Sequence, residues 1–278
     1  MLCFALQKRP SFMNDISFEK KFHNDWAKKV DINSIDVLRN NEVCTAPEMR
    51  YIIKKLGNLR GRTLLDIGCG LGEASVYFAM KGAIVTSSDL SPGMLEITSK
   101  FAEINNVSIH QHLANAEKLK LSLKKKFDIV YAGNLLHHVN IKNMILNLKP
   151  HIKNGGLFVS WDPMAYNPLI NIYRYIAKDV RTPDEHPLKI KDLRLIDKSF
   201  DRVEKKYFWF FTLIIFIIMA VFQRRNPNKE RFWKVILEEG DKWRWLYNPL
   251  EKLDNFFLFL FPPLKLLCWN VVIFAYKK

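Results

Sequence analysis

The stretch that decides the fold reads LLDIGCGLGEAS and runs from Leu64 to Ser75. An apolar segment with one acid, Asp66, leads into Gly68, Gly70 and Gly72, which are spaced two residues apart. This spacing predicts a turn too tight for side chains between a buried strand and the start of a helix. The backbone of such a loop and the N-terminus of the following helix suit a nucleotide-like ligand.

Short apolar segments alternate with helical ones on the C-terminal side of this loop. Further strands are predicted at 83–89, 107–115, 127–134 and 156–162. Ser91 and Asn140 stand where helix N-caps are expected. Strands that alternate with helices predict a parallel sheet covered on both faces.

The rest of the chain divides around this core by composition. The apolar spacing in residues 1–60 predicts N-terminal helices on the substrate side, one over 14–40 and one over 47–58. The Rossmann-like core covers 61–210. Residues 211–262 form an apolar helical insertion between the sixth and seventh strands, and 263–278 hold the final strand.

The composition bounds the class of protein. The 278 residues are 49% apolar and 26% charged, so a sizeable core is expected. The net charge of +15 favours an anionic partner such as a membrane surface, a nucleic acid or an acidic substrate, although biased base composition would give the same excess. The four cysteines form no CxxC pair, which argues against zinc and disulfides and for a reducing, cytoplasmic location. Residues 1–10 do not match a secretory signal.

The residues of the loop favour a cationic ligand. In a dinucleotide site the third glycine would come one residue later, where this chain has Glu73. A carboxylate beside a pyrophosphate is unfavourable, whereas Asp66 and Glu73 both suit a ligand with positive charge. S-adenosylmethionine (SAM) carries an α-ammonium and a sulfonium.

Four segments in order resemble the motifs of the class I SAM-dependent methyltransferases, in the branch of quinone and sterol enzymes. They are LLDIGCGLGEAS (64–75), VTSSDLSPGMLE (85–96), HLANAEKL (112–119) and FDIVYAGNLLHHV (127–139). The resemblance implies a seven-stranded, mostly parallel sheet with an antiparallel last strand and helices on both faces. It also implies SAM as cofactor and S-adenosylhomocysteine as product.

The resemblance assigns a cofactor site residue by residue. Three groups are expected: Asp66, Gly68, Gly70 and Gly72 at the methionine part; Asp89 at the ribose; and Leu90, Met94, Asn115 and Ala116 at the adenine. Asn134 is expected to face the sulfonium. Asn115 stands where the family usually has aspartate, which removes one charge.

Acceptor chemistry is expected beyond the fourth and fifth strands. His138 and His137 are candidate general bases, while the alternative is that one of them points into the core or caps a helix; no zinc role is expected for the pair. The candidate substrate residues are Asp162, Tyr166, Asn167, Arg174, Arg181 and His186. Helix capping and surface ion pairs are the structural alternative for this set.

An apolar run from Tyr207 to Phe222 raises the question of a membrane. As a helix it would span roughly 24 Å, less than the roughly 30 Å of a hydrocarbon core. Basic pairs flank it, so a helix that lies in the membrane interface is favoured over one buried in the core or one that spans. The expected location is peripheral, on the inner face of a membrane.

These patterns predict a SAM-dependent methyltransferase that acts on a small hydrophobic or lipid-linked acceptor at a membrane surface. The alternatives are a soluble small-molecule methyltransferase with a lid, an RNA methyltransferase, and a SAM-binding scaffold without turnover. Nucleic acid is disfavoured because no RNA-binding module is evident.

Overall fold

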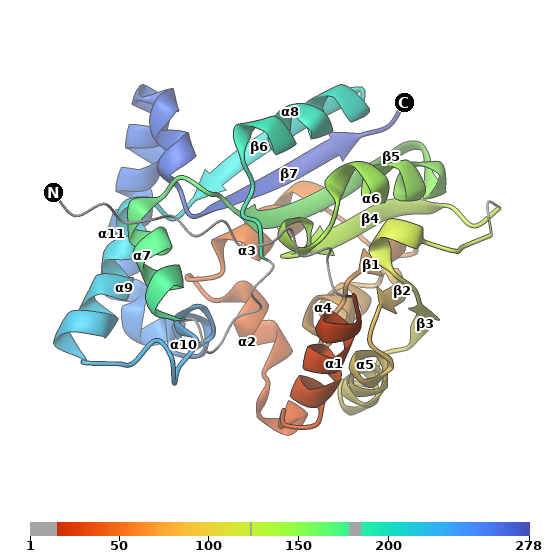
Figure 1. Cartoon of the computed structure of the whole chain (residues 1–278), viewed down its shortest axis with the longest axis horizontal. Coiled ribbons are helices and arrows are strands. Elements are labelled where there is room, and N and C mark those ends of the chain that lie inside the picture. The colour runs from red at the N-terminus through yellow and green to blue at the C-terminus, as the bar shows by residue number, and fades with distance from the viewer. Residues whose placement is uncertain (1–15, 123, 178–184) are drawn as a thin grey trace, which may run out of the picture.

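One sheet of seven strands, ordered β3-β2-β1-β4-β5-β7-β6, organises the computed structural model of the chain, which describes residues 16–122, 124–177 and 185–278 (Figure 1). The strands are β1 Thr63–Ile67, β2 Ile84–Asp89, β3 Ile109–Leu113, β4 Phe127–Gly133, β5 Ile152–Pro163, β6 Arg202–Phe208 and β7 Asn270–Tyr276. Strands β1 to β5 are parallel, and β7 runs antiparallel between β5 and β6. The predicted fold class is therefore confirmed.

Helices cover both faces of the sheet because the strand side chains alternate between two apolar clusters. The helices are α1 Ile16–Ala27, α2 Val37–Glu42, α3 Pro47–Leu56, α4 Glu73–Met80, α5 Pro92–Ile104, α6 Ile141–Leu148, α7 Pro168–Ile176, α8 Ile190–Ser199, α9 Ile214–Ile217, α10 Phe232–Glu238 and α11 Gly240–Leu260. One cluster joins α3, α4 and α5 to strand residues such as Ile129. The other joins α6 and α8 to residues such as Val130.

The N-terminal region differs from the single helix predicted over 14–40. Among the described residues, α1 ends at Ala27, a short 3-10 turn follows at Ile32–Ser34, and α2 starts at Val37. Asp31 and Asp36 cause the breaks, because each side chain accepts a hydrogen bond from a backbone amide two or three residues further on. Aspartate at such positions starts a new helix rather than continuing one.

The apolar run Tyr207–Phe222 is also not a single helix. Its first two residues end β6, and Trp209 has a positive φ of 68°. A 3-10 turn, the short helix α9 and a π-helical turn at Ile218–Phe222 follow. Asp254 of α11 fixes this start by accepting hydrogen bonds from the Thr212 hydroxyl and from three successive backbone amides. Within the described ranges, no helix combines the length and apolar character needed to cross a bilayer.

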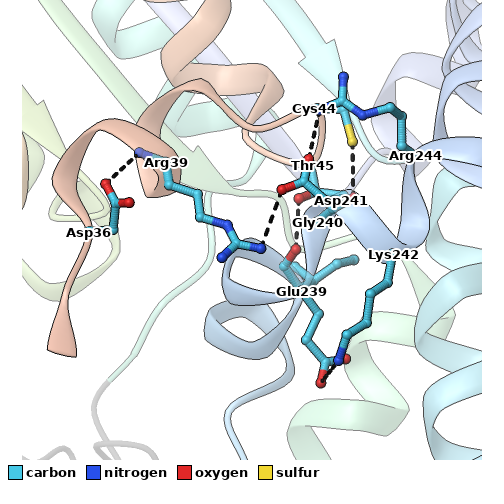
Figure 2. Close-up of polar contacts among 10 residues, drawn as sticks. Asp36, Arg39, Cys44, Thr45, Glu239, Gly240, Asp241, Lys242 and Arg244 are labelled. Carbon is cyan, nitrogen blue, oxygen red and sulfur yellow. Dashed lines mark hydrogen bonds and ion pairs between the residues drawn. The ribbon is translucent and has the colours of Figure 1, made fainter.

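The helices between β6 and β7 pack against the N-terminal helices rather than standing apart from them. The Thr45 hydroxyl donates to the Ile236 carbonyl at 2.7 Å, and Arg39 pairs with Asp241 at 3.3 Å (Figure 2). A Cβ on Gly240 would lie only 2.3 Å from a methyl carbon of Val43. The two chain segments therefore approach closely where glycine leaves room, and together they close one end of the sheet.

Candidate active site

One cavity of about 460 Å³ lies at the carboxyl ends of the parallel strands. Open α/β sheets bind their ligands at this edge. Most of the predicted cofactor residues line it: Asp66, Gly68, Gly70, Asp89, Leu90, Asn115, Ala116 and Asn134. Two do not: Met94 is fully buried beneath the site, and Gly72 serves as the N-cap residue of α4.

The glycines of the loop are required by its backbone. Gly68, Gly70 and Gly72 have φ values of +68°, +55° and +83°, which L side chains rarely adopt. A Cβ on Gly68 would lie 2.7 Å from Leu135, and one on Gly72 would lie 2.6 Å from Thr98. The loop can therefore present bare backbone to a ligand.

Asp89 holds this loop against the end of β2. Its carboxylate accepts from the Gly70 amide at 2.9 Å and from the Ser91 amide at 2.8 Å. Burial raises the pKa of Asp89, and the two backbone hydrogen bonds act in the opposite direction. The acid therefore has a structural role in the loop as well as the ribose role that the resemblance implies.

Asp66 is a buried acid whose hydrogen-bond network, within the described part of the chain, consists of serine hydroxyls. The Ser75 hydroxyl donates to it at 2.5 Å, and Ser87 donates to Ser75 at 2.6 Å. Burial raises the pKa of Asp66 to about 7, and the neighbouring Asp89 adds to this effect. A cationic ligand group beside Asp66 would favour its charged form.

Comparison with known proteins agrees with this geometry. A methyltransferase domain family matches residues 65–160. A ubiquinone biosynthesis O-methyltransferase of Glaesserella parasuis is 34% identical over 170 residues, which cover 58% of this chain and 70% of the relative. The chain belongs to the class I SAM-dependent methyltransferases.

Other relatives of this methyltransferase match a shorter part of it. A ubiquinone biosynthesis O-methyltransferase of Rickettsia canadensis is 32% identical over 148 residues, or 51% of this chain, and the chain spans 59% of that relative's length. The fold resembles the solved phosphoethanolamine N-methyltransferase 2 of Haemonchus contortus in complex with SAM. The TM-score is 0.54 at 16% identity, over 92% of this chain and 56% of that one.

The residues of this methyltransferase suit the family's cofactor. A Cβ on Gly70 would meet nothing within 4 Å, so the loop borders open space there, and Asp66 is a buried acid to which a ligand ammonium could be paired. Asn115 uses its side-chain oxygen to accept from the Glu117 amide at 2.7 Å, which turns the chain around the expected adenine position. Asn134, with φ of 55°, donates its backbone amide to the Trp161 carbonyl.

The two histidines after β4 have different surroundings. His137 is buried, and its Nδ1 lies 2.9 Å from Asp162 Oδ1. His138 is partly exposed in the cavity, and its Nδ1 lies 3.3 Å from Glu19 Oε1 on α1. The side chains of His138 and His23 lower the pKa of Glu19 against the opposing effect of burial.

Glu185 lies close to the same histidine pair. One ligand atom each from His137, His138 and Glu185 lie within 4.8 Å of one another. Imidazole nitrogens and a carboxylate oxygen are ligands that zinc accepts. The spacing of these residues in the sequence does not show this grouping, because 47 positions separate Glu185 from His138.

The predicted substrate residues are placed mostly in structural roles. Asp162 is completely buried behind His137 and does not line the cavity. Asn167 caps α7 through the Ile170 amide and donates to the Leu267 carbonyl.

Of the three others that the structure describes, one lines the cavity. Arg174 lines it and donates to the Met164 carbonyl at 3.4 Å. The Tyr166 hydroxyl accepts from a backbone amide of α8, and His186 is exposed outside the cavity lining. Arg181 lies outside the described residues.

The sequence predictions missed an aromatic wall and a buried acid in the same cavity. The wall consists of Tyr131, Trp161, Tyr173, Trp209 and Trp269, and the acid is Glu48 of α3. The Tyr131 hydroxyl accepts from Trp161 Nε1 at 2.9 Å, which links β4 and β5 at the cavity floor. Tyr131 lies within the fourth motif but has no predicted role there, and the other residues come from separate segments that no local motif marks.

Proposed function

We propose that the protein transfers the methyl group of SAM to a hydroxyl oxygen of a small lipophilic acceptor at a membrane surface. One observation carries the proposal: a single cavity joins the glycine loop to an aromatic wall. An aromatic enclosure beside the methyl donor suits an apolar acceptor that is desolvated when it binds.

His138 is the proposed general base. SAM supplies an already activated methyl group when bound, so the chain has to align the acceptor and remove its proton. His138 lines the cavity next to the end of β4, and Glu19 lies where it would stabilise the imidazolium that forms. His137 is fixed by Asp162 and serves to position the turn that carries His138.

The choice of an oxygen acceptor rests on the relatives. Those of Rickettsia canadensis and Glaesserella parasuis are both named ubiquinone biosynthesis O-methyltransferases. The aromatic wall of this chain agrees with a lipophilic ring as acceptor.

Exposed apolar side chains support action at a membrane surface. Phe259 on α11 is 84% exposed, Phe222 is 77% exposed and Tyr175 on α7 is 72% exposed. The elements that carry them lie at the same end of the molecule (Figure 1). Lys252 on α11 is exposed near Phe259 and adds attraction to anionic lipid. Aromatic and basic residues together are typical of interfacial docking.

The test is to incubate the full chain with methyl-deuterated SAM and a membrane lipid extract, followed by mass spectrometry of the products. We expect a lipophilic product heavier by one labelled methyl group, formed far more slowly by a His138→Ala chain. S-adenosylhomocysteine binding without any labelled product would contradict the proposal and favour a scaffold.

A further inference from the structure

Glu48 and Asn270 form a buried polar pair within the aromatic part of the cavity. Glu48 is the second residue of α3 and Asn270 is the first residue of β7. Asn270 Nδ2 donates to Glu48 Oε1 at 2.7 Å, and the side chains of both residues are at least nine-tenths buried. Burial raises the pKa of Glu48, and the side chains of Asn270 and Trp209 act in the opposite direction.

The strand order places this pair away from the cofactor residues. Asn270 pairs with Pro163 of β5 and with Phe208 of β6. The glycine loop follows β1, and β4 and β5 lie between β1 and β7. Three strand spacings amount to about 14 Å. The pair therefore lies on the acceptor side of the site.

The pair has unused capacity to accept hydrogen bonds. Asn270 Oδ1 is buried and has no hydrogen-bond partner among the residues that the structure describes. The hydrogen bond from Nδ2 to Glu48 turns the amide so that Oδ1 is left on its other side. A buried acceptor without a donor is costly, so a ligand that brings a hydrogen-bond donor would be stabilised here.

The surroundings of the pair favour an aromatic ligand. Trp209 and Trp269 meet edge to face with ring centroids 5.9 Å apart, and both line the cavity. Aromatic edges and faces accommodate a ring, and the buried acceptor Asn270 Oδ1 selects a ring that carries a hydrogen-bond donor.

We propose that Glu48 and Asn270 bind a hydroxyl group on the ring of the acceptor and so position it for the reaction. This inference rests on the proposed function, because it specifies how the same site recognises its acceptor. Glu48 acts as a positioning residue, while proton removal stays with His138. The pair discriminates a free hydroxyl from its methyl ether, since the ether has no hydrogen to donate.

The test compares two probes of similar size, 4-tert-butylphenol and its methyl ether, by calorimetry with the full chain saturated with S-adenosylhomocysteine. We expect the wild type to bind the phenol about tenfold more tightly than the ether. Glu48→Leu should reduce this preference to near one, and Glu48→Gln should restore part of it because its side-chain oxygen still accepts. A preference unchanged in Glu48→Leu, or absent in the wild type, would overturn the inference.

Controls separate this inference from the proposed function and from misfolding. Glu251→Leu removes a nearby carboxylate that lies on α11 and does not line the cavity, so it should keep the phenol preference. Unchanged S-adenosylhomocysteine affinity in each variant shows an intact fold. If Glu48→Leu still transfers methyl groups and keeps the wild-type preference for the phenol, the role of Glu48 is refuted while the proposed function stands. Benzyltrimethylammonium that binds better than the phenol would refute it in favour of a cationic acceptor.

Discussion

The two halves of the cavity are built in different ways. The cofactor half is defined by the residues predicted to bind SAM, which lie within 64–139 and rely on backbone groups and short side chains around the glycine loop. The acceptor half brings together α3, the ends of β5 and β6, α7, α10 and the start of β7, and it relies on large side chains. Substitutions in the two halves should therefore affect different measurements.

The largest effect is expected at His138, which lies where the halves meet. His138→Ala should lower kcat about a thousandfold, because a positioned general base contributes on the order of 10²–10⁴. S-adenosylhomocysteine affinity, measured by calorimetry, should change less than twofold. A smaller loss is expected for Glu19→Gln, since the base itself remains. Full activity in His138→Ala would assign proton removal to another group.

A second prediction concerns the pH dependence of stability in the acceptor half. Burial raises the pKa of Glu48 from 4.5 to about 7, so the folded chain keeps a proton that the unfolded chain releases between these values. The unfolding free energy should therefore fall as pH rises from 4.5 to 7, by up to about 3 kcal/mol from this group. Glu48→Gln should make that fall shallower in urea unfolding from pH 4.5 to 8.

The control for this prediction is Glu103→Gln, which removes an exposed carboxyl group on α5. It should leave the slope unchanged. Parallel pH curves for wild type and Glu48→Gln would show that Glu48 titrates normally in the folded chain.

The third prediction tests the cofactor half alone. Asp89→Ala removes the acceptor of the Gly70 and Ser91 amides and the group proposed for the ribose. S-adenosylhomocysteine should bind about 100-fold more weakly in calorimetry, which corresponds to the loss of one to two charge-assisted hydrogen bonds. Binding of 4-tert-butylphenol to this variant without cofactor should match that of wild type without cofactor. An equal loss of both ligands would show that the halves are not independent.

The smallest effect is expected at the surface beside the acceptor half. Phe256→Ser with Phe259→Ser should weaken binding to vesicles of phosphatidylcholine with 30% phosphatidylglycerol about tenfold in flotation, because both side chains are more than half exposed. The matched control is Leu113→Ser, an exposed apolar residue on β3 at the other edge of the sheet. Equal flotation of all three chains would exclude α11 as the docking surface.

The same comparison explains what could be predicted from the sequence. The strand alternation and the glycine spacing are local patterns, so the sheet, the loop and the turn that carries His138 could be predicted from 64–139. Asp162 is predicted at the substrate because it ends the fifth predicted strand, but its burial behind His137 depends on the turn after β4. Glu48 and Asn270 could not be predicted, because 222 positions separate them and neither belongs to a motif.

The contacts between the N-terminal helices and the helices before β7 have a consequence for biosynthesis. Thr45 and Ile236 are 191 positions apart, and Glu48 forms its hydrogen bond with Asn270, which lies 222 positions later in the chain. On the ribosome, the glycine loop and its strands emerge well before the segment that closes the aromatic side. Long-range contacts of this kind form last, since ordering the chain between them costs entropy. We therefore expect the side for the second reactant to stay open to water until the C-terminal segment has been made.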